Sequence, residues 1–160
     1  VIGVYAPGLI EPVAKTLKEP GMKRGFVVHG CGFDEVCITG RTEYAELKEN
    51  GTIKTSFFTP ADFGVCCAYS NEDFAGGLPQ KNADLALSIL SGHGSRAHND
   101  MIAANTALLL LAGNRVGTLS EGLKLARETL ASASAMPIVK AHRVFASSCA
   151  PQSTAAQKAA

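Results

Sequence analysis

The amino-acid sequence predicts a mixed α/β domain, with a mostly parallel sheet and a hairpin near its amino end and covering helices at its carboxyl end. Three observations carry this prediction. Two apolar, strand-like runs flank a helical pattern in the first thirty residues, which is the order of a βαβ unit. Runs of alternating polarity then flank Asn50-Gly51, and from Asn71 onward apolar residues recur with helical spacing.

The βαβ unit is expected over residues 1–29. Its strands are the apolar runs 1–5 and 25–29, and the first of them ends at a Pro-Gly loop signal. The helix between the strands is indicated by apolar residues at every fourth position, which are Leu9, Val13 and Leu17. Residues 30–32, with two glycines, predict a tight loop at the carboxyl end of the second strand.

The middle of the chain changes to a period of two. Residues 36–39 alternate in polarity and predict a short half-buried strand. The alternating runs 45–48 and 53–57 lie on either side of Asn50-Gly51, which is a strong signal for a hairpin. A helix over residues 42–49 is the competing interpretation and ranks second.

The carboxyl-terminal half is expected to be helical. The start and stop signals predict a helix from Asn82 to Gly92, one from Asn99 or Asp100 to Leu111, one after the capping box Thr118-x-x-Glu121, and a last one over residues 134–144. Residues 1–146 are therefore assigned to one domain. Residues 147–160 are small and polar without periodicity, which predicts a disordered or frayed tail.

Composition excludes several classes of protein. A hydrophobic fraction of 46% with 18% charged residues excludes a disordered chain. The net charge of +1 gives no basic surface for nucleic acid, and the apolar stretch 101–113 is too short to span a bilayer, which needs about 20 residues. We expect neither a nucleic acid nor a membrane as partner.

The five cysteines show no Cys-x-x-Cys spacing, and two of them, Cys66-Cys67, are adjacent. This usage is typical of reduced thiols in a cytoplasmic protein. A zinc site formed by His29, Cys31 and Cys37 is disfavoured, because structural zinc requires a fourth ligand. The chain starts with an apolar run that lacks an initiator Met and a basic flank, so this run is not expected to be a signal peptide. We expect the chain to begin within a larger protein.

The acidic pair Asp34-Glu35 is the strongest candidate for chemistry. Neighbouring carboxylates converge only where the backbone is irregular, because adjacent side chains on a strand point to opposite faces. The pair follows the expected loop at the carboxyl end of a strand, where open α/β sheets bind ligands. Paired carboxylates on a loop suit Mg²⁺, although a solvated acidic turn is the ordinary alternative.

Other motifs are weaker. The segment 92–97 imitates a dinucleotide fingerprint, but a helix precedes it where the fingerprint requires a strand, so an interhelical loop is favoured. His29 at the end of a strand is expected to anchor a loop, with substrate contact as the alternative. Asn105 and Thr106 in the apolar helix are expected to bond back to the preceding turn. The order of the residues supports neither a Ser-His-Asp nor a Cys-His catalytic arrangement.

An ordered series of motifs resembles the anthranilate phosphoribosyltransferases over about residues 1–135. The matching segments, in chain order, are Gly3-Val4-Tyr5, Val27-Val28-His29-Gly30, Gly32-Phe33-Asp34-Glu35, Thr39-Gly40, Thr59-Pro60-Ala61-Asp62-Phe63-Gly64, Gly76-Gly77 and Asn82-Ala83. The resemblance is to the carboxyl-terminal half of that enzyme. It implies part of the large α/β domain, of the nucleoside phosphorylase and phosphoribosyltransferase type, which in the family is joined to a small helical domain.

The resemblance also implies a reaction of tryptophan biosynthesis, catalysed in the cytoplasm by a pentosyltransferase. The amine of anthranilate displaces pyrophosphate from phosphoribosyl pyrophosphate, and Mg²⁺ binds the pyrophosphate. The family's acidic pair, which matches Asp34 and Glu35, helps to hold one metal ion, and the complete enzyme is expected to be a homodimer. No covalent nucleophile is expected.

Departures from the family pattern are equally informative. The family's glycine-rich phosphate loop, its Lys-His-Gly-Asn segment and its anthranilate-contacting arginine lie upstream of Val1, Phe33 replaces a usual Leu, and Ser95-Arg96 replaces a usual Gly-Pro. After Ala135 the resemblance ends. We therefore expect an open sheet edge or apolar face and an inactive isolated chain. The alternatives are a non-catalytic relative that binds a nucleic acid or a protein, and a pyrimidine nucleoside phosphorylase.

Overall fold

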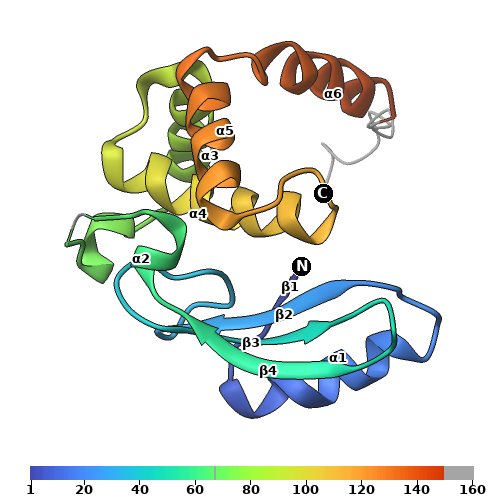
Figure 1. Ribbon diagram of the computed structural model, residues 1–160. Helices are drawn as coiled ribbons and strands as arrows, with labels where there is room; N and C mark the ends of the chain where they lie inside the picture. Colours follow the sequence, from blue (N-terminus) through green and yellow to red (C-terminus); the bar gives the residue numbers. More distant parts are fainter. Residues whose placement is uncertain (67, 150–160) are drawn as a thin grey trace, which may run out of the picture.

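The computed structural model describes residues 1–66 and 68–149. A four-stranded sheet carries α1 on one face and α4 and α5 on the other (Figure 1). The strands are β1 (Ile2–Gly3), β2 (Gly25–Gly30), β3 (Thr42–Leu47) and β4 (Ile53–Phe58). The helices are α1 (Ile10–Lys18), α2 (Pro60–Phe63), α3 (Pro79–Ser88), α4 (Arg96–Ala112), α5 (Leu119–Ala131) and α6 (Met136–Cys149). Short helical turns occur at η1 (Pro7–Leu9), η2 (Asn71–Phe74) and η3 (Ile89–His93).

The sheet has the order β1-β2-β3-β4. β1 is parallel to β2, with Ile2 opposite Val27, whereas β2–β3 and β3–β4 are antiparallel. The mixed α/β class, the βαβ unit and the hairpin at Asn50-Gly51 are confirmed. The expectation of mostly parallel strands is wrong, because one of the three strand pairs in the described residues is parallel. Parallel pairing needs a crossover connection, and among these strands α1 supplies one, between β1 and β2.

Two hydrophobic clusters lie on opposite faces of the sheet, as the alternation of side chains along β2 requires. Val27 faces α1 and packs in the cluster Val4, Ile10, Ala14, Val27 and Ala45. Val28 faces the carboxyl-terminal helices and packs in the larger cluster, which includes Leu108 and Leu123. The predicted stripe of α5 is buried at all four positions, which are Leu119, Leu123, Ala126 and Leu130. The sheet is therefore covered on both faces.

Several predicted boundaries are wrong. Residues 36–38 form no strand although all three are buried, and residues 42–49 contain β3 rather than the competing helix. α4 begins at Arg96, earlier than predicted, because the Ser95 hydroxyl accepts a hydrogen bond from the backbone of His98 and caps the helix. Asn82 lies inside α3 and does not cap it. Its amide instead bonds the backbone of Gly77.

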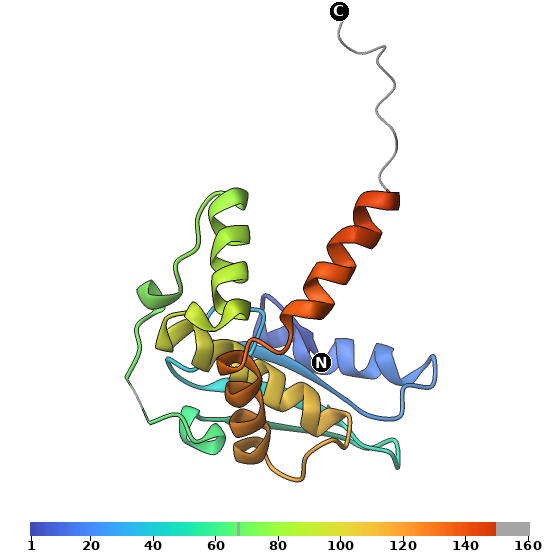
Figure 2. The same cartoon turned by 90° about the horizontal axis from the view of Figure 1, so that it is seen from above.

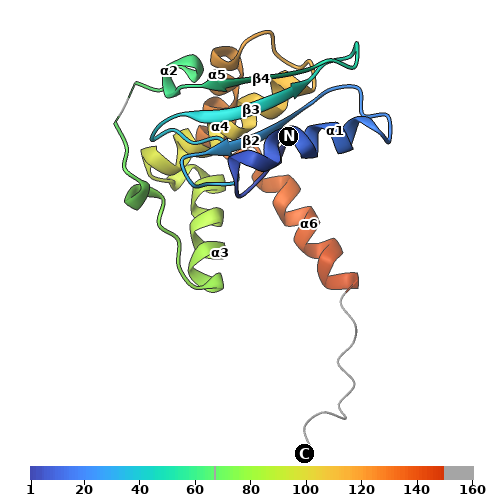
Figure 3. The same cartoon turned by 90° about the horizontal axis from the view of Figure 1, so that it is seen from below.

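The helices α3 and α6 project from the same side of the molecule, as Figures 2 and 3 show. α6 buries none of its residues and exposes Ile138, Val144 and Phe145. It extends to Cys149, so residues 147–149 are helical and the predicted tail begins too early. The rest of that tail, residues 150–160, lies outside the described residues. No helix in the described part of the chain is long and apolar enough to cross a bilayer.

The expected open edge lies at β1, which pairs with β2 on one side. Ile2 of β1 is exposed, as are the preceding Val1 and Leu109 on α4. Val1 and Leu109 lie beside the segment that carries the acidic pair, whereas Ile2 is opposite Val27 and faces the side of α1.

Candidate functional site

The acidic pair lies in the segment 31–41, which connects β2 to β3 and which we call the acidic loop. It leaves β2 through a tight turn in which the Gly30 and Phe33 backbones exchange hydrogen bonds of 3.0 and 2.7 Å. Both central residues have positive φ, 50° at Cys31 and 88° at Gly32, as in the type I′ turns of hairpins. The predicted tight loop is confirmed, and its reversal brings Asp34 back over β1.

Two glycines let the acidic loop rest directly on the sheet. A Cβ atom on Gly3 of β1 would collide with the backbone carbonyl of Asp34. A Cβ atom on Gly30 of β2 would lie 2.7 Å from the carbonyl oxygen of Glu35 and 2.5 Å from the Cβ of Cys37. Glycine is required at both positions because real Cβ atoms do not approach other atoms so closely. The acidic pair is thus seated by residues of two neighbouring strands.

Asn105 of α4 clamps the acidic loop from the helical side. Its Oδ1 accepts a hydrogen bond from the Val36 backbone nitrogen at 2.9 Å, and its Nδ2 donates to the Val36 carbonyl at 3.0 Å. The expected bond to the preceding turn is also present, from Nδ2 to the Met101 carbonyl at 3.1 Å. Sequence reasoning missed the other two bonds, and the available signal was a polar amide in an otherwise apolar helix.

The end of the acidic loop is fixed by a buried hydroxyl. The Thr42 Oγ1 accepts a hydrogen bond from the Cys37 nitrogen at 2.9 Å and donates to the Cys37 carbonyl at 3.3 Å. These bonds explain how residues 36–38 are buried without forming a strand. Side chains of Asn105 and Thr42 take the place of a neighbouring strand as backbone partners, which removes the cost of burying unpaired backbone groups.

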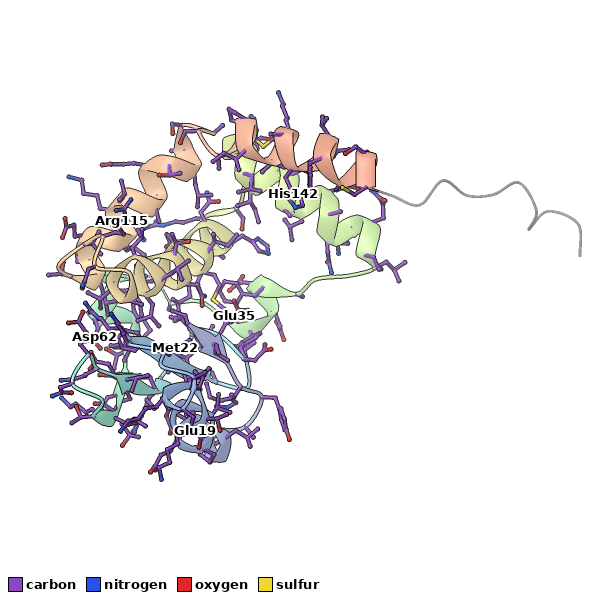
Figure 4. The ribbon with its side chains drawn as sticks, turned by 90° about the vertical axis from the view of Figure 1, so that its right-hand side faces the viewer. Glu19, Met22, Glu35, Asp62, Arg115 and His142 are labelled. Atoms are coloured by element: carbon purple, nitrogen blue, oxygen red, sulfur yellow. The ribbon has the colours of Figure 1, made fainter. Side chains whose placement is uncertain are left out.

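Asp34 and Glu35 are both exposed and line a groove of about 320 Å³. Figure 4 shows Glu35 at the boundary between the sheet and the helices. Partial burial raises the pKa of the Glu35 carboxyl, and the neighbouring charge of Asp34 raises that pKa further. A raised pKa was expected from repulsion within the pair, but burial is the larger cause. The other lining residues are Val1, Gly3, Val28, Asn105, Thr106 and Leu109.

The donor atoms at this groove fit Mg²⁺. Carboxylate oxygens are hard ligands, and Mg²⁺ in proteins is usually held by one or two of them, with water and phosphate oxygens filling the other positions. Among residues 1–66 and 68–149, no cluster of three or more His, Cys, Asp or Glu side chains could enclose a metal ion. The acidic pair therefore suits a cation that arrives with a phosphate-bearing ligand.

His29 makes a structural hydrogen bond, in keeping with the expectation that it anchors a loop. Its Nδ1 donates a hydrogen bond to the Val4 carbonyl at 2.8 Å and so links β2 to the end of β1. Segment 92–97 connects η3 to α4, so it forms an interhelical loop and not a strand-to-helix turn. The other three histidines lie on η3, α4 and α6.

Sequence reasoning also missed a buried ion pair between α4 and α5. The Asp100 carboxylate is almost fully buried and accepts a hydrogen bond from the Arg127 guanidinium at 2.7 Å. The Tyr69 hydroxyl donates to its second oxygen, also at 2.7 Å. Because the Asp100 charge is paired and hydrogen-bonded, its burial needs no functional explanation.

Comparisons with known proteins agree along most of the chain. A model of the glycosyl transferase family, a/b domain, matches residues 1–136. An anthranilate phosphoribosyltransferase of Colwellia psychrerythraea is 42% identical over 132 residues, covering 82% of this chain and 36% of the relative. One from Pectobacterium carotovorum is 50% identical over 110 residues, covering 69% of this chain and 30% of the relative.

Solved structures are similar over a longer range. The crystal structure of anthranilate phosphoribosyltransferase from Thermus thermophilus matches 91% of this chain and 42% of its own, with a TM-score of 0.77 and 32% identity. The enzyme from Saccharomyces cerevisiae, in complex with PRPP and Mg, matches 91% of this chain and 40% of its own, with a TM-score of 0.76 and 28% identity. The chain thus spans about two fifths or less of the length of these relatives.

Proposed function

This chain belongs to the glycosyl transferase family, through the α/β domain that covers residues 1–136, and we propose that it forms the carboxyl-terminal part of an anthranilate phosphoribosyltransferase. The reaction would transfer phosphoribosyl from phosphoribosyl pyrophosphate (PRPP) to the amine of anthranilate and release pyrophosphate, as a step of tryptophan biosynthesis. The proposal is supported by relatives of that name that cover most of the chain.

The observation that carries the proposal is the seating of the acidic pair. Gly3 and Gly30 let the acidic loop lie on the strands, and Asn105 holds it from the helix, so Asp34 and Glu35 are presented at the mouth of a groove. Three separate elements therefore hold the acidic turn in one position before any ligand binds. We assign to Asp34 and Glu35 the holding of Mg²⁺ together with the pyrophosphate group of PRPP.

When bound, Mg²⁺ would stabilise the negative charge that develops on the leaving pyrophosphate. The role of this chain's residues is to hold the Asp34 and Glu35 carboxylates in position. The acidic loop is fixed before ligand binds, because its backbone is bonded to Asn105 and Thr42. Preorganised carboxylates need little rearrangement during the reaction, which is the condition for effective electrostatic stabilisation. The similar Saccharomyces cerevisiae enzyme is known in complex with PRPP and Mg, which supports Mg²⁺ as the cation of the proposed reaction.

A chimera tests the proposal. The upstream part of the Colwellia psychrerythraea enzyme, joined to residues 1–136 of this chain, should consume anthranilate in the presence of PRPP and Mg²⁺, followed by the loss of anthranilate fluorescence. Asp34→Asn and Glu35→Gln should each lower kcat/KM by at least about tenfold, since each removes one charged ligand, and a tenfold change corresponds to about 1.4 kcal/mol. Raising the Mg²⁺ concentration should restore part of the loss.

The matched control is Glu128→Gln, an exposed carboxylate on α5 that pairs only loosely with Lys124 at 4.0 Å. It should leave the kinetics of the chimera unchanged. A folded chimera that is inactive would contradict the proposed activity. An active chimera that tolerates both acidic-loop substitutions would instead contradict the role of Asp34 and Glu35.

We also propose that the complete enzyme is cytoplasmic and forms a homodimer. We propose neither a membrane nor a nucleic acid as its partner. The cysteines Cys31, Cys37, Cys66 and Cys149 are free, as expected of a protein in a reducing compartment. Sedimentation of the active chimera should give twice the monomer mass. A monomeric active enzyme would contradict the proposed assembly.

A further inference from the structure

The strand β4 forms the second edge of the sheet, at the opposite end from β1 (Figures 1 and 3). Its inner side pairs with β3 along its whole length, and no strand of the described residues pairs with its outer side. Proteins usually protect such an edge with proline, a bulge, several charges or a covering segment. β4 contains no proline and one charged residue, Lys54, and residues 54–57 are exposed. Its outer side is therefore available for pairing with another strand.

The hydrogen-bond ladder between β3 and β4 determines which backbone groups point outward. The Lys48 nitrogen donates to the Thr52 carbonyl at 2.9 Å, so these two residues form a hydrogen-bonded pair. Such pairs alternate along an antiparallel ladder, and therefore Lys54 and Ser56 direct their backbone groups towards β3. The residues between them direct their backbone nitrogen and oxygen away from the sheet. We call these the outward residues, and they are Ile53, Thr55 and Phe57.

We propose that β4 pairs antiparallel with β4 of a second copy of this chain, about a two-fold axis at Thr55. When Thr55 lies opposite the partner's Thr55, Ile53 lies opposite the partner's Phe57, and Phe57 lies opposite the partner's Ile53. Outward residues then face outward residues, so each pair exchanges two backbone hydrogen bonds. A shift by two positions would instead place one outward residue opposite Thr59 or Gly51, beyond the ends of the strand.

The side chains on both faces of the sheet are compatible with this pairing. Ile53 packs against the hydrophobic cluster beneath α1, so the outward residues have their side chains on the α1 face. Phe57 is 45% exposed, and the partner's Ile53 would cover it, because directly opposite side chains are in contact. On the other face, Lys54 would lie opposite the partner's Ser56, so like charges are not directly opposed. The edge thus carries both members of each apolar pair, which is the condition for pairing with a second copy.

The association of the complete 160-residue chain is the first measurement, and it does not depend on the proposed transferase activity. A contact centred on five residues of each strand is small, and interfaces below about 1,200 Å² are typical of weak complexes. Sedimentation velocity should therefore give a coefficient that rises with protein concentration towards that of a dimer. A chain that stays monomeric up to a concentration of about 1 mM would overturn the proposal.

Hydrogen exchange of the unsubstituted chain tests the register. The amides of the outward residues should exchange more slowly as the protein concentration rises, because the partner strand accepts their hydrogen bonds. The amides of Lys54 and Ser56 already donate to β3 and should keep the same exchange rate at every concentration. Exchange of the Thr55 amide that does not change with concentration would overturn the proposal.

Charges at the two-fold axis test the position of the contact. Thr55→Lys and Thr55→Glu each place like charges opposite each other, so each should raise the dissociation constant by about fivefold or more. An equimolar mixture of the two variants should associate at least as tightly as the parent, since opposite charges then face each other. Thr16→Lys is the matched control, because it makes the same change at an exposed position of α1 and should associate as the parent does.

Circular dichroism establishes that each variant is folded, and the hydrogen exchange of the unsubstituted chain gives a result even if the Thr55 variants unfold. Unchanged association of both Thr55 variants would overturn the proposal and would place the contact elsewhere, such as at the exposed apolar residues of α6. A mixture that associates no better than either variant alone would also overturn it.

Discussion

The backbone carbonyl of Asp34 occupies the space where a side chain on Gly3 would begin. This contact joins the first residue of the acidic pair to the strand at the sheet edge. It leaves no room for a side-chain atom between the Gly3 backbone and the Asp34 carbonyl. The position of Asp34 is therefore set by the absence of a side chain 31 positions earlier. Replacing that glycine tests whether the seating of the acidic loop matters.

Gly3→Ala should displace the acidic loop, because the new methyl group meets backbone and not the end of a flexible side chain. We expect a loss of about 2–3 kcal/mol in the free energy of unfolding, at the upper end for an overpacked site. Urea denaturation followed by circular dichroism measures it. Gly8→Ala is the matched control, since a Cβ atom at Gly8 has open space around it. Equal stability of the two variants would contradict the seating model.

Asn105→Leu should lower the free energy of unfolding by about 1–3 kcal/mol, because it keeps the side-chain volume but leaves the backbone nitrogen and oxygen of Val36 without their partner. Hydrogen exchange of the Val36 amide should become faster by one to two orders of magnitude, at about 1.4 kcal/mol for each factor of ten. Thr106→Val, at the next position of α4, is the control and should leave that exchange rate unchanged. Protection of Val36 in Asn105→Leu would show that the clamp is dispensable.

Glu35→Gln should change how stability depends on pH. The folded state raises the pKa of Glu35 above its ordinary value of 4.5, so the folded protein binds more protons than the unfolded one between the two values. Stability therefore falls as the pH rises through this window, and the cost persists above it. Glu35→Gln lacks a titrating group, so its free energy of unfolding should exceed that of the parent at neutral pH, and this advantage should vanish below pH 4.5.

Chemical denaturation from about pH 3 to pH 8 measures this difference. The matched control is Asp62→Asn, whose carboxylate has the opposite behaviour because hydrogen bonds from Thr59 lower its pKa. Such a group contributes stability above its ordinary value and loses it as the pH falls, so Asp62→Asn should be less stable than the parent at neutral pH. Identical pH profiles for Glu35→Gln and the parent would contradict the raised pKa.

Local patterns were sufficient for the framework of the fold. The apolar runs around Leu9 and Val28, the Asn50-Gly51 turn and the capping box at Thr118 each act over a few residues, and each appears in the structure. The acidic pair itself could also be found, because two adjacent carboxylates after a glycine turn at a strand end are visible in the sequence. Its metal ligation stays a prediction.

The support of the site could not be predicted, because its partners are distant in sequence. Asn105 bonds Val36 across 69 positions, and Gly3 meets Asp34 across 31. The strand expected over residues 36–39 failed for the same reason: alternating polarity marks burial, but the backbone partners turned out to be side chains of Asn105 and Thr42. Long-range side-chain bonds of this kind leave no periodic trace.

The isolated 160-residue chain should show no measurable transferase activity. Catalysis of this reaction requires two substrates to be held in reacting geometry, and such positioning can contribute about 7–11 kcal/mol. The groove beside Asp34 and Glu35 offers one acidic edge, and the chain spans about two fifths of the length of its relatives. We therefore expect the groups that hold ribose phosphate and anthranilate in the proposed reaction to lie outside these residues. Two exposed carboxylates alone should bind Mg²⁺ only weakly, because this ion shares its coordination shell with substrate phosphates. Anthranilate fluorescence in the presence of PRPP and Mg²⁺ provides the assay. Turnover by the purified chain that is lost in Asp34→Ala would contradict this prediction and would mean that a complete site exists within these residues.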